Sequence, residues 1–112
     1  MTKELIGREK FRPFDAARYL TTPKRQAAYL AAALETEDEA YIKLALLALA
    51  RAQGMSKTAR AANVSRQGLY KSLSATSDPK LSTVLAVFQA LGVQLTVRHT
   101  GDSRVADDPV TG

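Results

Sequence analysis

Four side chains on one short segment have the chemistry to read nucleic acid: Arg66, Gln67, Tyr70 and Lys71. Counted around a helix from Leu69, Gln67 and Lys71 fall on the opposite face. Arg66 and Tyr70 fall on the flanks of that face. Arginine can bond guanine in a bidentate way, glutamine can do so with adenine, and an apolar ring surface can pack on a thymine methyl. The spacing therefore predicts a helix with base-reading tips above an apolar underside.

A tight turn is predicted directly before this segment, at Asn63-Val64-Ser65. Asn63 tolerates the left-handed conformation in which a helix can end. The Ser65 hydroxyl can accept a hydrogen bond from a free backbone N–H and so cap the next helix. Within Ser56–Leu73 (SKTARAANVSRQGLYKSL) two short helices thus flank the turn, and the small Ala59 lets them cross closely. This is the pattern of a helix-turn-helix DNA reader.

The positive charge of the chain is concentrated on the same region. The chain has 16 Lys and Arg against 11 Asp and Glu, a net charge of +5. Residues 51–80 hold six basic residues and one acidic residue, so they account for the whole excess. Phosphate contacts need local positive charge, and released counterions supply much of the affinity. The predicted phosphate contacts are Ser56, Lys57, Arg60, Ser65, Lys71 and Lys80, and the predicted base contacts are Arg66, Gln67 and Tyr70.

Composition points to one small domain without a cofactor. The chain has 112 residues, 46% of them hydrophobic, and no cysteine, which excludes disulfides, thiol nucleophiles and thiolate metal sites. No apolar stretch approaches the roughly 20 residues that span a bilayer, and the N-terminal residues do not read as a secretory signal. We expect a cytoplasmic protein with a flexible arm at 1–13, a helical domain at 14–98 containing the helix-turn-helix at 56–73, and a disordered tail at 99–112.

Two helices are expected before the helix-turn-helix. Thr22-Pro23 combines an N-cap with a proline at the first helical position, so one helix should run from there to about Leu34. Its core-facing stripe would be Ala27, Leu30, Ala31 and Leu34. Thr36 and Glu39 form a capping-box pattern for the next helix. From Ala40 to Ala50 that helix has a single polar residue, Lys43, so it should be buried on most sides, and Gly54 should end it.

One helix and a short strand are expected after the helix-turn-helix. Residues 81–91 place Val84, Leu85, Phe88 and Leu91 at helical spacing and end at Gly92. The following residues alternate apolar and polar, which indicates a strand with Val93, Leu95 and Val97 on one side. A lone strand cannot satisfy its own backbone, so it must pair with a second copy, with a partner protein or with the N-terminal arm.

Three segments resemble the Xre-like (HigA-type) addiction-module antidote proteins. They are Phe14–Glu35, Leu49–Ser74 and Asp78–Val97. The most specific part is Ser65–Ser74 (SRQGLYKSLS), because helix-turn-helix proteins in general do not share its Gly-Leu-Tyr-Lys run. The resemblance implies a mainly α helical bundle of lambda-repressor-like type that binds operator DNA and represses its own operon. It also implies an antitoxin that neutralises a RelE/HigB-type toxin, which cleaves translated mRNA.

A homodimer and a toxin complex are the expected assemblies. One helix-turn-helix reads too few bases for an operator, so a twofold dimer is expected, joined through Val93–Val97 or through an apolar patch at Phe88 and Leu91. The toxin could bind Met1–Leu34 or the terminal strand. A group of acidic residues would also attract a basic toxin: Glu35, Glu37, Asp38 and Glu39. Negative charge at the start of a helix has a local cause as well, since it suits the macrodipole.

Other functions fit parts of the same sequence. A stand-alone repressor without a toxin would share every DNA-reading feature. Within the DNA-binding interpretation, Arg66, Gln67 and Tyr70 could instead contact phosphate, and Tyr70 could be a half-buried packing residue. A structural or protein-binding helical module would use the cations only for solubility. An enzyme is disfavoured, because the single histidine, His99, lies far in sequence from any carboxylate cluster and no metal-binding or phosphate-loop spacing is present.

Overall fold

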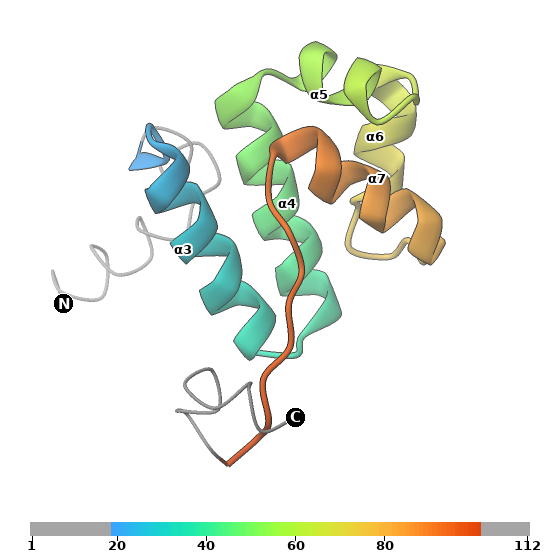
Figure 1. Cartoon of the computed structure of the whole chain (residues 1–112). Coiled ribbons are helices and arrows are strands. Elements are labelled where there is room, and N and C mark those ends of the chain that lie inside the picture. The colour runs from blue at the N-terminus through green and yellow to red at the C-terminus, as the bar shows by residue number, and fades with distance from the viewer. Residues whose placement is uncertain (1–18, 102–112) are drawn as a thin grey trace, which may run out of the picture.

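The computed structural model describes residues 19–101, in which five helices are joined by short connections (Figure 1). The helices are α3 (Pro23–Glu35), α4 (Glu39–Gln53), α5 (Met55–Ala61), α6 (Arg66–Ser72) and α7 (Leu81–Leu91). The predicted mainly helical class is confirmed. The predicted arm at 1–13 and most of the predicted tail at 99–112 lie outside the described residues.

Helix α3 begins as the sequence predicted but turns a different side to the core. Thr22 Oγ1 accepts a hydrogen bond from the Arg25 N–H at 3.1 Å, which caps the helix. Leu30 is buried as expected, whereas Ala27 and Ala31 are exposed. The predicted stripe is wrong at these two alanines because α3 packs mainly on α4, so that Ala33 faces the core and the opposite side stays open.

The connection between α3 and α4 differs from the predicted capping box. Asp38, not Thr36, is the N-cap of α4, and its Oδ1 accepts from the Tyr41 N–H at 3.2 Å. The Thr36 hydroxyl instead donates to the Ala33 carbonyl at 2.6 Å, at the end of α3. Glu37 adopts a left-handed φ of 57°, which reverses the chain within three residues and leaves Asp38 extended, the conformation of a helix cap.

Helix α4 lies at the centre of the bundle and contacts α3, α5 and α7. Its buried residues, Lys43, Ala45, Leu46, Ala48, Leu49 and Ala50, confirm that it is covered on most sides. Lys43 is only 7% exposed, and its ammonium group donates to the carbonyl oxygens of Ala75, at 3.1 Å, and Ser77. A buried charge requires such partners. Lys43 therefore holds the connection that follows α6 against the central helix.

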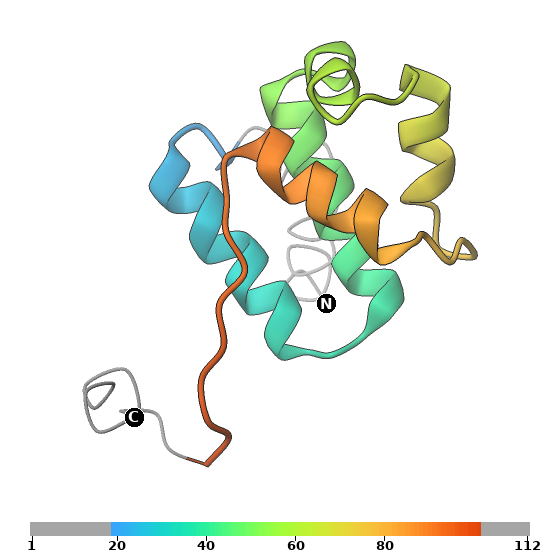
Figure 2. The ribbon, with the colours of Figure 1, turned by 45° about the vertical axis from the view of Figure 1, so that its right-hand side comes forward.

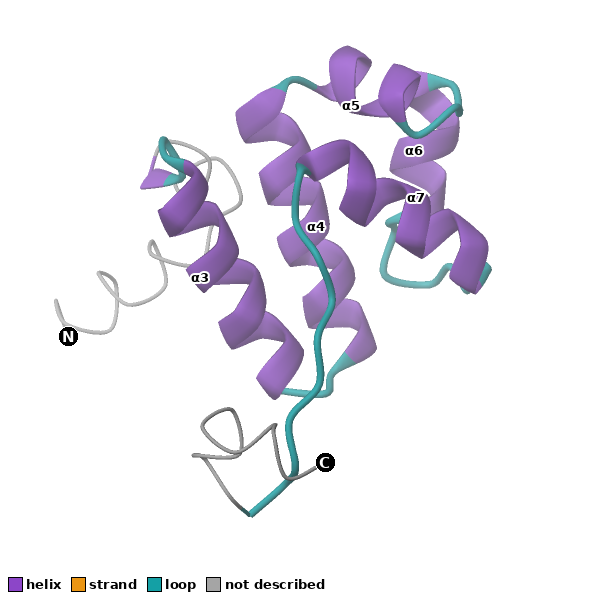
Figure 3. Ribbon diagram, viewed as in Figure 1, coloured by secondary structure: helices purple, strands orange, loops and turns teal. Residues whose placement is uncertain are grey.

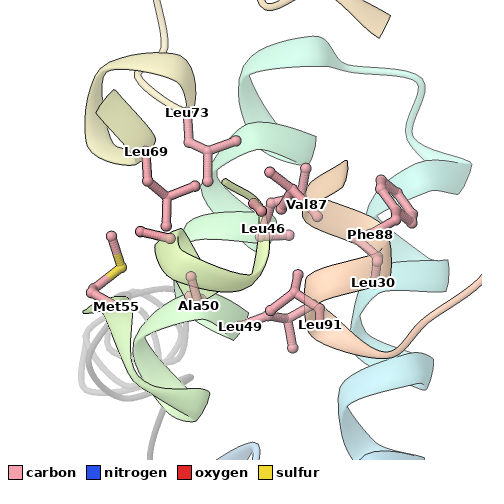
Figure 4. Close-up of a cluster of buried hydrophobic side chains, with 14 of the residues drawn as sticks. Leu30, Leu46, Leu49, Ala50, Met55, Leu69, Leu73, Val87, Phe88 and Leu91 are labelled. Carbon is pink, nitrogen blue, oxygen red and sulfur yellow. The ribbon is translucent and has the colours of Figure 1, made fainter. Parts of the chain in front are cut away.

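Helix α7 completes the core, and it ends in the left-handed conformation of Gly92 (φ 78°) as predicted. In Figure 4 Val87 and Leu91 lie toward Leu46 and Leu49 of α4, and Phe88 lies toward Leu30 of α3. The predicted core stripe is wrong at Leu85, which is 43% exposed, because Val87 takes the buried position. The predicted dimer patch at Phe88 and Leu91 is also wrong, because these side chains are 3% and 4% exposed and belong to the core.

Residues 93–98 form an extended segment that runs along α3 (Figure 2). At its start the Val93 N–H donates to the Phe88 carbonyl at 3.1 Å, and at its end Arg98 Nη2 pairs with Glu35 Oε2 at 3.0 Å. Between residues 19 and 101 there is no strand (Figure 3), so the predicted strand is not confirmed. The physical reason is that a strand needs a second one to bond, and this part of the chain supplies none.

Replacing Thr58 with valine should raise the free energy of unfolding by about 1 kcal/mol, measured by chemical denaturation. The Thr58 side chain is 1% exposed, and its hydroxyl has no hydrogen-bond partner among the described residues. A buried hydroxyl without a partner costs about 1–3 kcal/mol, and valine has nearly the same shape without that polar atom. The matched control is Thr96→Val at an exposed site, which should change little. A clear loss of stability in Thr58→Val would contradict the assignment of an unpaired hydroxyl.

Candidate nucleic-acid interface

Helices α5 and α6 are joined by the tight turn that the sequence predicted. Asn63 adopts a left-handed φ of 62°, and the Val64 N–H donates to the Ala59 carbonyl at 2.9 Å, which closes the end of α5. Ser65 is the N-cap of α6, and its Oγ accepts from the Gly68 N–H at 2.9 Å. A Cβ at residue 68 would come within 3.0 Å of that oxygen, so glycine allows the cap to close. These contacts fix the direction in which α6 leaves the turn.

The two helices are held by their apolar sides. Leu69 and Leu73 are 0% and 2% exposed and point from α6 into the core in Figure 4. Ala59, which is 2% exposed, is the small residue of α5 at the crossing with α6. Full burial of one leucine is worth about 1.5–3 kcal/mol relative to exposure. The core therefore positions α6 firmly, and its remaining sides face outward.

The outward sides of α5 and α6 carry most of the predicted contact residues. Exposed side chains of α6 and its cap include Ser65, Arg66, Gln67 and Lys71, and those of α5 include Ser56, Lys57 and Arg60. The Ser65 hydroxyl accepts its capping bond, so its own proton remains available to donate. Ser56 lies inside α5, which begins after Gly54 without a side-chain cap.

Tyr70 occupies a different setting from the other predicted base contacts. Its side chain is half-buried and packs against the hydrophobic core. The guanidinium carbon of Arg51, near the end of α4, lies 5.8 Å from the centre of the Tyr70 ring. At that distance a cation is attracted to the ring face. Arg51 is exposed and lies against α6 through this contact, which joins two separate helices and so has no pattern in the sequence.

The exposed cations between the end of α4 and the start of α7 are named here the cationic face: Arg51, Lys57, Arg60, Arg66, Lys71 and Lys80. Lys80 stands just before α7, as the last residue of the connection that Lys43 holds. Within residues 19–101 the one ion pair joins Arg98 and Glu35, so the cationic face has no carboxylate partner there. Unpaired cations around an exposed helix have the electrostatics needed to bind phosphate groups.

The predicted partner strand lies apart from the cationic face. Residues 93–98 and α3 enclose an open groove of about 800 Å³, named here the α3 groove. Its apolar walls include Ala27, Ala31, Leu34, Val93, Leu95 and Val97, and Glu35 and Glu37 also line it. Val97 is 92% exposed and Leu95 is 40% exposed.

Burial, reinforced by the neighbouring Tyr41, raises the pKa of Tyr29, which lies on the α4 side of α3.

The described residues offer little else for chemistry. No group of three or more His, Asp or Glu side chains in residues 19–101 is placed to hold a metal ion. None of the helices in that range combines the length and the apolar character that crossing a bilayer requires.

Comparison with known proteins places the chain in a family. A family model described as "Probable addiction module antidote protein" matches residues 10–99. A protein of Haemophilus influenzae described as uncharacterized is 40% identical over 92 residues, which cover 82% of this chain and 95% of that protein. No solved structure matches the chain significantly. The chain therefore belongs to the family of probable addiction module antidote proteins.

Proposed function

We propose that the protein is the antitoxin of a type II toxin–antitoxin module and represses its own operon by binding operator DNA. The observation that carries the DNA part is the cationic face, where exposed cations without a carboxylate partner among residues 19–101 accompany two helices held by a capped turn. The antitoxin part rests on family membership, since an antidote requires a toxin. In this proposal the chain acts in the cytoplasm, as an Xre-like (HigA-type) antidote without catalysis or cofactor.

In the complex with DNA, α6 would enter the major groove with its N-terminal end toward the bases. Arg66 and Gln67 are proposed to contact base edges, because both are exposed at that end. The side chains proposed to contact phosphate are Ser56, Lys57, Arg60, Ser65, Lys71 and Lys80. Tyr70 was predicted to read bases, but its ring is half-buried. We therefore propose that the ring instead orients Arg51 toward the phosphates.

For the toxin, the proposed site is the α3 groove. Gln94–Val97 offer extended backbone with no backbone partner within the described residues, so an edge strand of the toxin could pair with it. Val93, Leu95 and Val97 would then contact alternate side chains of that strand. The proposed toxin is of the RelE/HigB type, a basic protein, and Glu37 beside the groove would attract it, whereas Glu35 is already paired with Arg98. Toxin and DNA would thus bind different surfaces.

Co-expression with the product of the adjacent gene tests the antitoxin proposal. The unaltered chain should relieve the growth arrest that the adjacent product causes, and Leu95→Lys should lose this relief because it places a charge in the apolar wall of the groove. Arg66→Ala is the matched control, since it lies outside the groove and should keep the relief. A neighbouring product that causes no arrest, or equal relief by both variants, would contradict the toxin site.

The alternative proposal is a stand-alone repressor of the same DNA-binding type. It would use the cationic face in the same way and would leave the α3 groove without a toxin. A gene neighbourhood without a short basic reading frame would favour it.

A further inference from the structure

Helix α7 exposes two leucines on the side that faces away from α4 and α5. Leu81 is 70% exposed and Leu85 is 43% exposed, and they lie one helical turn apart on the same side. The helix carries no charged residue, and on this side only Ser82 and Gln89 are exposed polar side chains. Two neighbouring large apolar side chains, named here the α7 knob, therefore lack the cover that the rest of the core receives.

An apolar pocket opens directly beside the α7 knob. It has a volume of about 200 Å³ and is named here the Leu73 pocket. Its apolar lining comes from α4, the end of α6 and the residues around the start of α7: Ile42, Leu46, Leu73, Pro79 and Val84. Lys43 also lines it, but its ammonium group is already bound by the carbonyls of Ala75 and Ser77. Val84 lies one turn beyond Leu81, so knob and pocket are neighbours on one surface. A leucine side chain has the size and polarity to enter such a pocket.

The charges around the knob and the pocket are opposite in sign. Lys80 precedes Leu81 and is exposed, whereas Glu39 and Asp78 line the pocket and are also exposed. If Leu81 of one molecule enters the pocket of another, Lys80 arrives beside those carboxylates. In a twofold dimer the same contacts form twice, because each copy carries both the knob and the pocket on one surface. The patch is therefore complementary to itself.

We propose that this surface joins two copies of the chain, with the α7 knob of each copy in the Leu73 pocket of the other. The partner is a second copy rather than another protein because the knob, the pocket and both signs of charge lie together on one molecule. Leu73 closes α6, so the contact would also fix the spacing of the two α6 helices. This inference deepens the proposed function, for which a twofold operator needs such a dimer.

Sedimentation equilibrium of the protein alone tests the inference without DNA. The interface is small, so the dissociation constant is expected on the order of 10–100 micromolar. Leu81→Asp should raise it by about a hundredfold or more, because two leucines lose their burial. Aspartate in the first turn of α7 is compatible with the helix, and circular dichroism should show unchanged helix content.

Charge exchange provides a second and independent readout. Lys80→Glu should weaken the dimer by about threefold to tenfold, and Asp78→Lys combined with Lys80→Glu should restore it. The control is Leu95→Asp, which alters the α3 groove and should leave the dimer unchanged.

Three outcomes would overturn the inference: a monomer at about 1 mM protein, a Leu81→Asp variant that dimerises like the unaltered chain, or loss of the dimer in Leu95→Asp alone. The last outcome would assign the dimer to residues 93–97. A dimer sensitive to Leu81 that binds no DNA would leave the inference standing and would contradict the proposed function instead.

Discussion

Replacing Lys43 with methionine should lower the free energy of unfolding by about 2–3 kcal/mol. The Lys43 ammonium group is the buried donor for two carbonyl oxygens, those of Ala75 and Ser77. Hydrogen bonds to a charged group contribute about 1.5–3 kcal/mol, and methionine leaves both carbonyls without this donor. Its apolar chain fills similar space, so the loss reports mainly the polar contacts. Chemical denaturation followed by circular dichroism measures the change.

The matched control for this prediction is Lys24→Met on α3, where the lysine is exposed. That substitution removes the same charge without removing a buried contact, so it should change stability by less than about 0.5 kcal/mol. The connection from Ser74 to Lys80 should also exchange its amide hydrogens faster in Lys43→Met than in the control. Equal stability of the two variants would show that Lys43 does not hold this connection.

Replacing Arg66 with alanine should weaken binding to operator DNA by about 1–3 kcal/mol and relax the preference at one base pair. Arg66 is the first residue of α6 and is exposed at the end that would meet the base edges. Lys57→Ala, on α5, should instead weaken binding to all sequences alike. The slope of log affinity against log salt concentration should fall by the amount expected for about one phosphate contact. Fluorescence anisotropy on operator and random DNA separates the two effects.

Lys24→Ala controls for the loss of one positive charge outside the cationic face, and it should have a much smaller effect. If Arg66→Ala and Lys57→Ala lose the same affinity on random DNA and keep the same preference for the operator, the division into base and phosphate contacts is wrong.

Features with a local cause could be predicted from the sequence. The turn between α5 and α6 depends on Asn63 and Ser65, each of which acts on backbone within a few residues of itself. The same holds for the start of α3 at Thr22 and the end of α7 at Gly92. Capping chemistry is encoded where it acts, so these four positions were predicted correctly.

Features that depend on a neighbour could not be predicted in the same way. The position of Ala27 and Ala31 depends on which side of α3 meets α4. Between Thr36 and Asp38 either side chain can cap a helix, and the conformation of Glu37 decides between them.

The candidate site shows the same division. Exposure of Arg66 and Gln67 follows from helical spacing, because the buried Leu69 fixes the orientation of α6. The contact of Arg51 with the Tyr70 ring joins two helices and has no sequence signal. Residues 93–97 show strand alternation, but a strand forms only with a partner, so the sequence could not establish whether the segment is paired.

The most direct test of the DNA-binding proposal is the affinity of the purified protein for the DNA upstream of its own gene, measured at several salt concentrations. We expect binding to be tighter than to random DNA of equal length by about 10³-fold or more. The logarithm of the affinity should fall linearly with the logarithm of salt concentration, by about 0.9 for each phosphate contacted. Equal affinity for both DNAs, or no binding at low salt, would contradict a repressor that reads its operator through α6.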